Sequence, residues 1–183
     1  NITEAVSYLS GIDKSTAHTA AGVTASVAVI TGNGVPAEKK TFTLTTGVDT
    51  FTGGGSADTF TADNTGSTAT SSTADTLKGG DGTDTLEIFT AGTAATAAIP
   101  KLTSVEKINI YDMDVAFDAS GVTGLTDLNI YRGEGDDTYT VASGVDVGIN
   151  ELVVGTGTDN AATTVAFSAT QTSANLTLDK VTA

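Results

Sequence analysis

From residue 41 onward, large apolar residues alternate with polar ones over short runs, which is the pattern of strands with one buried face. Phe42 and Leu44 begin the pattern between threonines, and the run at 105–111 aligns with the run at 125–131. Leu128, Leu152 and Leu176 follow at equal intervals, which predicts equivalent places in successive turns. A repeat of about 20–24 residues with two or more short strands predicts an all-β fold, a parallel β-solenoid or β-helix.

The N-terminal 40 residues differ from the rest of the chain, and two segments within the predicted solenoid differ from its strands. Residues 1–40 lack the alternation, and apolar spacing at 2–9 favours a helix, while 20–30 fits a helix or a strand equally well. We therefore divide the chain into a small, partly helical or irregular N-terminal lead-in, 1–40, and a solenoid, 41–183.

Within the solenoid, 64–74 and 90–98 have few apolar anchors and are expected to leave it as loops. Asn109 and Asn129 are expected at equivalent places, either as a ladder or facing solvent.

The stretch 79–87 matches the nine-residue pattern G-G-x-G-x-D-x-U-x, where U is a large apolar residue, at every fixed position. This pattern is typical of calcium-binding β-helix repeats. Glycines permit a tight turn and a close approach of backbone carbonyls to a cation, and Asp84 adds the charged oxygen that Ca²⁺ prefers. One turn supplies only part of a coordination shell, so a second turn must stack beside it.

Related stretches surround this motif. The stretch 53–61 departs from the pattern only at Ser56, and 132–140 departs only at Arg132, while 155–159 is a weaker copy. A half-motif, D-x-U-x, stands at 49–52 and at 75–78, so that its aspartate lies nine residues before Asp58 and Asp84 respectively. We expect each half-motif to form the turn that stacks beside its full motif. The alternative is a set of glycine-aspartate turns that bind no ion. The predicted metal-binding residues are Asp49, Gly53, Gly55, Asp58, Asp75, Gly79, Asp81, Gly82, Asp84, Gly133, Gly135, Asp136 and Asp137.

Charge and composition exclude several classes of protein. The net charge is −14, from 22 acidic and 8 basic residues, which argues against nucleic-acid binding and against adsorption to an anionic membrane. There is no cysteine and hence no disulfide, so a secreted protein of this kind needs another source of stability, and bound metal ions would provide one. We expect no membrane insertion, because no apolar run has the required length. The first residues do not form a signal peptide, and we expect the chain to be a piece of a longer protein.

Enzymatic activity is not expected. The chain has no H-E-x-x-H motif of a zinc protease and no G-x-S-x-G nucleophile motif. Paired aspartates on a β-helix could cleave a polysaccharide, but here they stand in turn motifs. Arg132 is the only arginine that could bind an acidic sugar.

The glycine-aspartate motifs, together with the strand runs at 42–49 and 105–110, resemble RTX secreted proteins and, more narrowly, proteobacterial RTX surface-layer proteins. The resemblance implies type I secretion, a calcium-ordered solenoid and an extracellular location at the cell surface. It implies a structural role in a lattice of identical copies, with lipopolysaccharide or cell-surface glycan held by parts outside this segment. The alternative is a repeat module of a large RTX adhesin or another extracellular matrix protein. The motifs here do not form one tandem block, so a smooth β-roll is not expected.

Overall fold

The computed structural model describes residues 37–91, 98–112, 116–133, 137–152, 163–170 and 173–181. The chain divides into two compact units, Asn1–Glu38 and Lys39–Ala183. The helix predicted at 2–9 and the ambiguous segment 20–30 lie outside the described residues. Among the residues that are described, no helix has the length and apolar character needed to cross a membrane.

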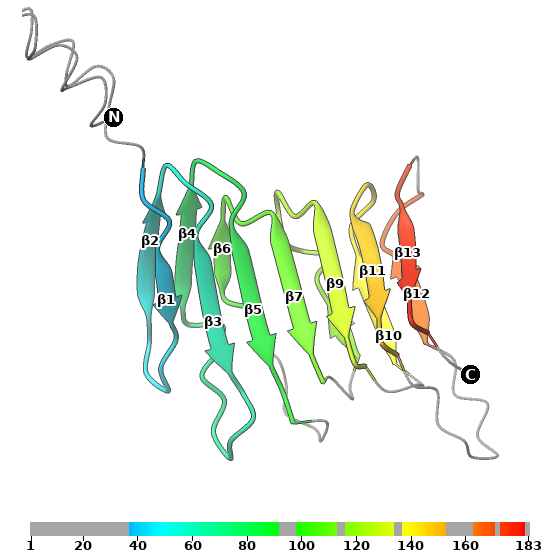
Figure 1. The fold of residues 1–183 in the computed structure, drawn as a ribbon, viewed down its shortest axis with the longest axis horizontal. Helices are drawn as coiled ribbons and strands as arrows, with labels where there is room; N and C mark the ends of the chain where they lie inside the picture. The colour runs from blue at the N-terminus through cyan, green and yellow to red at the C-terminus, as the bar shows by residue number, and fades with distance from the viewer. Residues whose placement is uncertain are drawn as a thin grey trace, which may run out of the picture. The chain divides into compact units, whose positions relative to one another are not determined.

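The second unit is an all-β parallel solenoid, as predicted (Figure 1). One long sheet contains every odd-numbered strand from β1 to β11 together with β13. Its strands are β1 (Thr41–Thr43), β3 (Thr59–Asp63), β5 (Thr85–Phe89), β7 (Lys107–Tyr111), β9 (Asp127–Tyr131), β11 (Asp146–Asn150) and β13 (Leu176–Asp179).

Two short sheets supply the remaining strands. The first short sheet contains β2 (Thr50–Gly54), β4 (Thr76–Gly80) and β6 (Lys101–Thr103), and the second contains β8 (Phe117–Asp118), β10 (Thr138–Val141) and β12 (Thr164–Phe167). Every strand pair among the described residues is parallel. The chain therefore passes from the long sheet to a short sheet and back in each turn, which we call a rung.

The alternation of apolar and polar residues determines which side chains enter the core. In β5, β7 and β9 the second and fourth residues are buried and the others are only half-buried, because successive side chains of a strand point to opposite faces. Paired strands place these buried residues in columns, one rung above another. Each rung therefore buries its apolar surface against its neighbours. The buried columns of the long sheet contain Phe60, Ala62, Leu86, Ile88, Ile108, Ile110, Leu128, Ile130, Val147 and Ile149.

The registers confirm one predicted repeat and correct another. Lys107 pairs with Asp127, as the alignment of 105–111 with 125–131 predicts. The equal spacing of Leu128, Leu152 and Leu176 was right for two of the three leucines. Leu128 and Leu176 both pair with Val147 and so share one column, but Val147 rather than Leu152 stands between them. Leu152 lies beyond the end of β11. The reason is that the corners differ in length, so residues in register are not equally spaced along the chain.

Polar contacts hold the predicted loop at 64–74, which joins β3 to β4. The buried Asn64 side chain accepts hydrogen bonds from the Thr70 and Ser71 amides, at 2.8 and 3.1 Å, and donates one to the Ser71 hydroxyl. A buried amide thus replaces the missing apolar anchor. In the second predicted loop, 92–97 lie outside the described residues.

Candidate metal centre in the glycine-aspartate turns

Two of the glycine-aspartate motifs form turns that stack on each other. One turn leads from β2 to β3 and the other from β4 to β5, so both connect the first short sheet to the long sheet. Gly54 pairs with Gly80, and the Asp81 amide donates a 2.8 Å hydrogen bond to the Gly54 carbonyl. The fold therefore places two motif turns side by side, 26 residues apart along the chain.

Glycine is needed where these turns meet. A Cβ on Gly79 would collide with the Ser104 carbonyl oxygen and with the Asp84 carboxylate. Gly82 has a φ of 126°, and a Cβ there would come within 2.6 Å of the Ser56 carbonyl carbon. Backbone consequently packs directly on backbone, and the aspartate side chains lie against the turns rather than in solvent.

The acidic side chains of the turns form a ladder across four rungs. Asp58 Oδ1 accepts a 2.6 Å hydrogen bond from the Lys40 amide, and Asp84 Oδ1 accepts one of the same length from the Asp58 amide. Glu106 Oε2 accepts a 2.9 Å hydrogen bond from the Asp84 amide. Each of these four residues immediately precedes a strand of the long sheet. We call Lys40, Asp58, Asp84 and Glu106 the corner ladder.

The second carboxylate oxygen of each ladder aspartate is buried without a hydrogen bond. Asp58 is 1% and Asp84 0% exposed, and Oδ2 of both accepts no hydrogen bond. An unpartnered buried polar group costs about 1–3 kcal/mol, and more when it is charged. The arrangement therefore stores an unfavourable energy that a cation beside these oxygens would remove.

The environment of Asp84 is also unfavourable for a buried negative charge. Burial raises the pKa of the Asp84 carboxyl above its usual value, and the nearby Glu106 and Asp58 carboxylates raise it further. The hydrogen bond from the Asp58 amide opposes this rise in pKa. The site thus disfavours a bare negative charge, and such sites are suited to a divalent cation.

Lys40 places a positive charge at the first of the stacked turns. Its ammonium nitrogen donates a 2.6 Å hydrogen bond to the Gly53 carbonyl oxygen.

The sequence prediction missed both Lys40 and Glu106, because neither belongs to a glycine motif. The signal was present in the residues that follow: Lys40 precedes the same Thr-Phe-Thr run that follows Asp58, and Glu106 precedes a run of the same alternation.

Asp49 and Asp75 lie in a separate position. Asp75 Oδ1 accepts a 3.0 Å hydrogen bond from the Asp49 amide and Oδ2 accepts a 2.8 Å bond from the Ser72 amide, while Asp49 Oδ2 accepts a 2.7 Å bond from the Thr45 amide. Strand β4 separates Asp75 from Asp84, so the half-motif does not form the neighbouring turn as expected. Nine residues correspond to one strand and one corner, which is only part of a rung.

The other predicted residues are more dispersed. Gly55 and Asp81 are exposed in the stacked turns. Gly133 and Asp137 are buried in the connection from β9 to β10, whereas Gly135 and Asp136 lie outside the described residues, as does 155–159. In the described parts of the chain, no group of three or more His, Cys, Asp or Glu side chains is placed to hold a metal. A cation at the stacked turns would accordingly depend on backbone carbonyls together with Asp58 and Asp84.

A scan against protein-family models found no match, and searches of curated proteins and of solved structures found no significant match either.

Proposed function

We propose that this chain is a structural module of a secreted bacterial surface-layer protein that calcium folds and assembles. The observation that carries the proposal is the pair of buried, unpartnered carboxylate oxygens, Asp58 Oδ2 and Asp84 Oδ2, in stacked glycine turns. Ca²⁺ takes oxygen ligands from carboxylates and backbone carbonyls, and both are concentrated at these turns. The resemblance of the motifs to RTX proteins agrees with this choice of ion.

The aspartates and glycines of the turns would have different roles in binding the ion. Asp58 and Asp84 would supply charged oxygens, while their other oxygens keep the hydrogen bonds that fix the turns to the preceding rung. Gly53 and Gly79 would keep space for backbone carbonyls at the same place. Bound calcium would supply positive charge and several coordination positions, so its binding energy would add to the folding energy.

The structural role follows from what a solenoid offers to neighbouring copies. Its polar faces are built from repeated strands, and the chain carries a net charge of −14 without cysteines. Calcium can join such acidic surfaces where disulfides are absent. The location would be the cell exterior, and attachment to lipopolysaccharide or glycan in a lattice would use parts outside this segment. An adhesin repeat is the alternative, and formation of a regular two-dimensional lattice with calcium would distinguish a surface-layer protein from it.

Asp84→Asn tests the metal centre, with Asp179→Asn as the matched control. Both changes remove one negative charge, but Asp179 is exposed on β13. In about 1 mM calcium, Asp84→Asn should lower the melting temperature and weaken calcium binding, since one charged ligand is lost. In excess chelator, the same variant should be at least as stable as the original chain, because it removes a buried charge.

Calorimetric titration with Ca²⁺, followed by thermal melts monitored by circular dichroism with and without chelator, measures both effects. Asp179→Asn should behave as the original chain does in every condition. Identical melting curves for the ion-stripped and calcium-loaded original chain would refute a calcium-folded module.

A further inference from the structure

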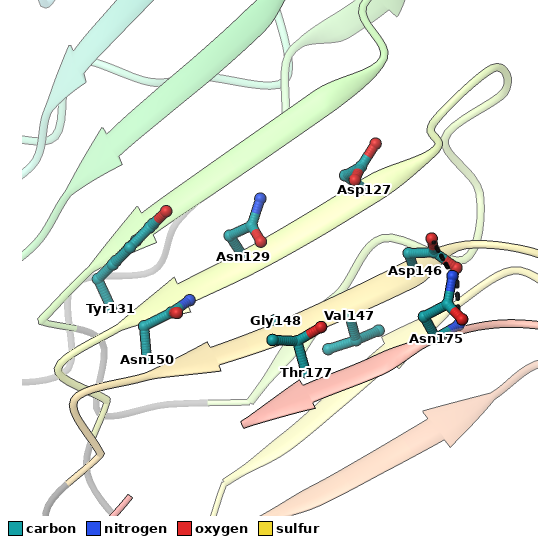
Figure 2. A pocket seen from close by; sticks show the side chains of 9 residues that line it. All are labelled: Asp127, Asn129, Tyr131, Asp146, Val147, Gly148, Asn150, Asn175 and Thr177. Atoms are coloured by element: carbon teal, nitrogen blue, oxygen red, sulfur yellow. Dashed lines mark hydrogen bonds between the residues drawn. The ribbon is translucent and has the colours of Figure 1, made fainter. Parts of the chain in front are cut away.

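A groove on the outer face of the long sheet lies away from the glycine-aspartate turns. It extends over β9, β11 and β13 and has a volume of about 310 Å³ (Figure 2). Its lining includes Asp127, Asn129 and Tyr131 from β9, and Asp146, Gly148 and Asn150 from β11. Along each strand these residues alternate with the core-facing ones, so they belong to the outer side of the sheet, although Gly148 itself is buried.

A column of stacked aromatic rings ends at this groove. The rings of Phe89 and Tyr111 are 4.5 Å apart and those of Tyr111 and Tyr131 are 4.8 Å apart, both pairs being nearly parallel. On the next strand, Asn150 takes the paired position. One face of the Tyr131 ring stacks on Tyr111 of β7. The opposite face points toward β11 and the groove, where Asn150 lies beside it (Figure 2). Asparagine is shorter than tyrosine, so a flat ligand lying over Asn150 would contact the part of the Tyr131 ring that extends beyond it.

Gly148 makes the floor of the groove low. It pairs with Asn129 on one side and Thr177 on the other. A Cβ on Gly148 would collide with Asn129 Oδ1, so the asparagine side chain already leans over the glycine. Any larger residue at this position would fill the groove and displace the asparagine.

The polar groups around the floor are held in place by their own neighbours. Asn129 Nδ2 donates a 3.1 Å hydrogen bond to Asn109 Oδ1, confirming the asparagine ladder. The Asp146 carboxylate accepts hydrogen bonds of 2.7 and 2.8 Å from the backbone amide and side chain of Asn175 (Figure 2). These hydrogen bonds lower the pKa of Asp146, so its charge is retained at neutral pH.

We propose that this groove binds a neutral oligosaccharide. A sugar ring has apolar C–H faces that would pack on Tyr131, and hydroxyls that would exchange hydrogen bonds with Asn129, Asn150 and the carboxylate of Asp146. Rigid aromatic residues supply such contact area at a low cost in conformational entropy. The distance across three parallel strands is about 10 Å, which suits a short saccharide.

The charges and shape argue against other ligands. Asp127 and Asp146 pair in register at one end of the groove, so acidic polysaccharides would be repelled. A peptide strand would add to a sheet edge, whereas this groove lies on a sheet face. An apolar ligand would leave the amide and carboxylate groups without partners. The proposal concerns the outer face of β9 and β11 and does not depend on calcium binding at the turns.

Affinity electrophoresis of the whole chain in calcium tests the proposal, using gels that contain mannan, dextran, a mixed-linkage β-glucan or alginate as the acidic comparator. Chito-oligosaccharides can be titrated in solution, with tyrosine fluorescence as the readout because the chain has no tryptophan. At least one neutral probe should bind, and alginate should not. Tyr131→Ala and Gly148→Val should weaken that binding at least tenfold, whereas Tyr131→Phe should retain it and lose part of the fluorescence change.

Thr61→Ala is the matched control, because Thr61 is on the same sheet, several strands away on β3. It should bind as the original chain does. Circular dichroism of every variant shows whether its fold is kept. Failure of all neutral probes to bind, binding of alginate alone, or equal affinity in folded Tyr131→Ala would overturn the proposal.

Discussion

The carboxyl of Asp84 combines full burial with an oxygen that has no hydrogen-bond partner, so its ionisation should oppose folding when no metal is bound. Burial raises the folded-state pKa of Asp84 above the unfolded value of about 3.9. The free-energy cost of ionising Asp84 in the folded state is therefore absent below about pH 4 and grows as pH rises through the folded-state pKa. A bound cation would reverse the effect by favouring the charged form.

This conflict predicts a pH-dependent difference between the original chain and Asp84→Asn in excess chelator. The original chain should lose stability relative to the variant as pH rises above about 4, and the loss should level off once the folded-state pKa of Asp84 is passed. Using the variant as reference cancels the opposite contributions of Asp112, Asp118 and Asp146, whose pKa values are lowered by hydrogen bonds. Urea unfolding at four pH values measures the difference, and a difference independent of pH would contradict it.

Gly79 and Gly66 provide a second test at the scale of single residues. A Cβ at Gly79 would collide with the Ser104 carbonyl and the Asp84 carboxylate, whereas a Cβ at Gly66 meets nothing within 4 Å. Gly79→Ala should therefore reduce the free energy of unfolding by about 1–3 kcal/mol, as overpacking does. Gly66→Ala should change it by less than about 0.5 kcal/mol. Equal stability of the two variants in urea unfolding would show that the turns do not pack as described.

Individual strands contribute unequally to the solenoid. Ile108 of β7 is fully buried with paired strands on both sides, whereas Leu178 of β13 is 61% exposed. Ile108→Ala should therefore cost about 2–5 kcal/mol, while Leu178→Ala should cost less than about 1 kcal/mol. Thermal melts with calcium present would compare them, and the prediction fails if Leu178→Ala is the more damaging change.

The strands could be predicted from sequence because alternation reports directly which side chains face the core. Runs such as 107–111 and 127–131 have the same order of apolar and polar residues, so their pairing was also predictable. The pairing of Leu128 with Val147 was not, since corner length varies and only the three-dimensional register reveals which residues meet. Regular spacing in sequence therefore gave the fold class but not every pair.

The candidate metal centre was predictable to a similar degree. Glycine-aspartate patterns identified Asp58 and Asp84, because close backbone packing demands glycine. The partner of each aspartate depends on the length of a whole rung, so Asp84 contacts Asp58 rather than Asp75. Lys40 and Glu106 differ chemically from aspartate, and their places in the corner ladder follow only from their position before a strand.

At the scale of the whole molecule, net charge should control association. With a charge of −14, copies repel at low calcium, over a range of about 10 Å in 0.1 M salt. Calcium that bridges exposed carboxylates would change repulsion into attraction, whereas monovalent salt would only screen it. Sedimentation should show larger species in millimolar calcium than in sodium chloride of equal ionic strength. A folded monomer in both solutions would contradict assembly by this segment.

The stacking of parallel strands also has a mechanical consequence. The hydrogen bonds between rungs connect one strand to the next along the direction of stacking, so tension in that direction loads the bonds of successive rungs in series. Each rung contacts chiefly its neighbours, and the terminal strand β13 is exposed at every residue. Under load the module should extend in small steps, rung after rung, and so dissipate work that a molecule with a single cooperative core would release in one rupture.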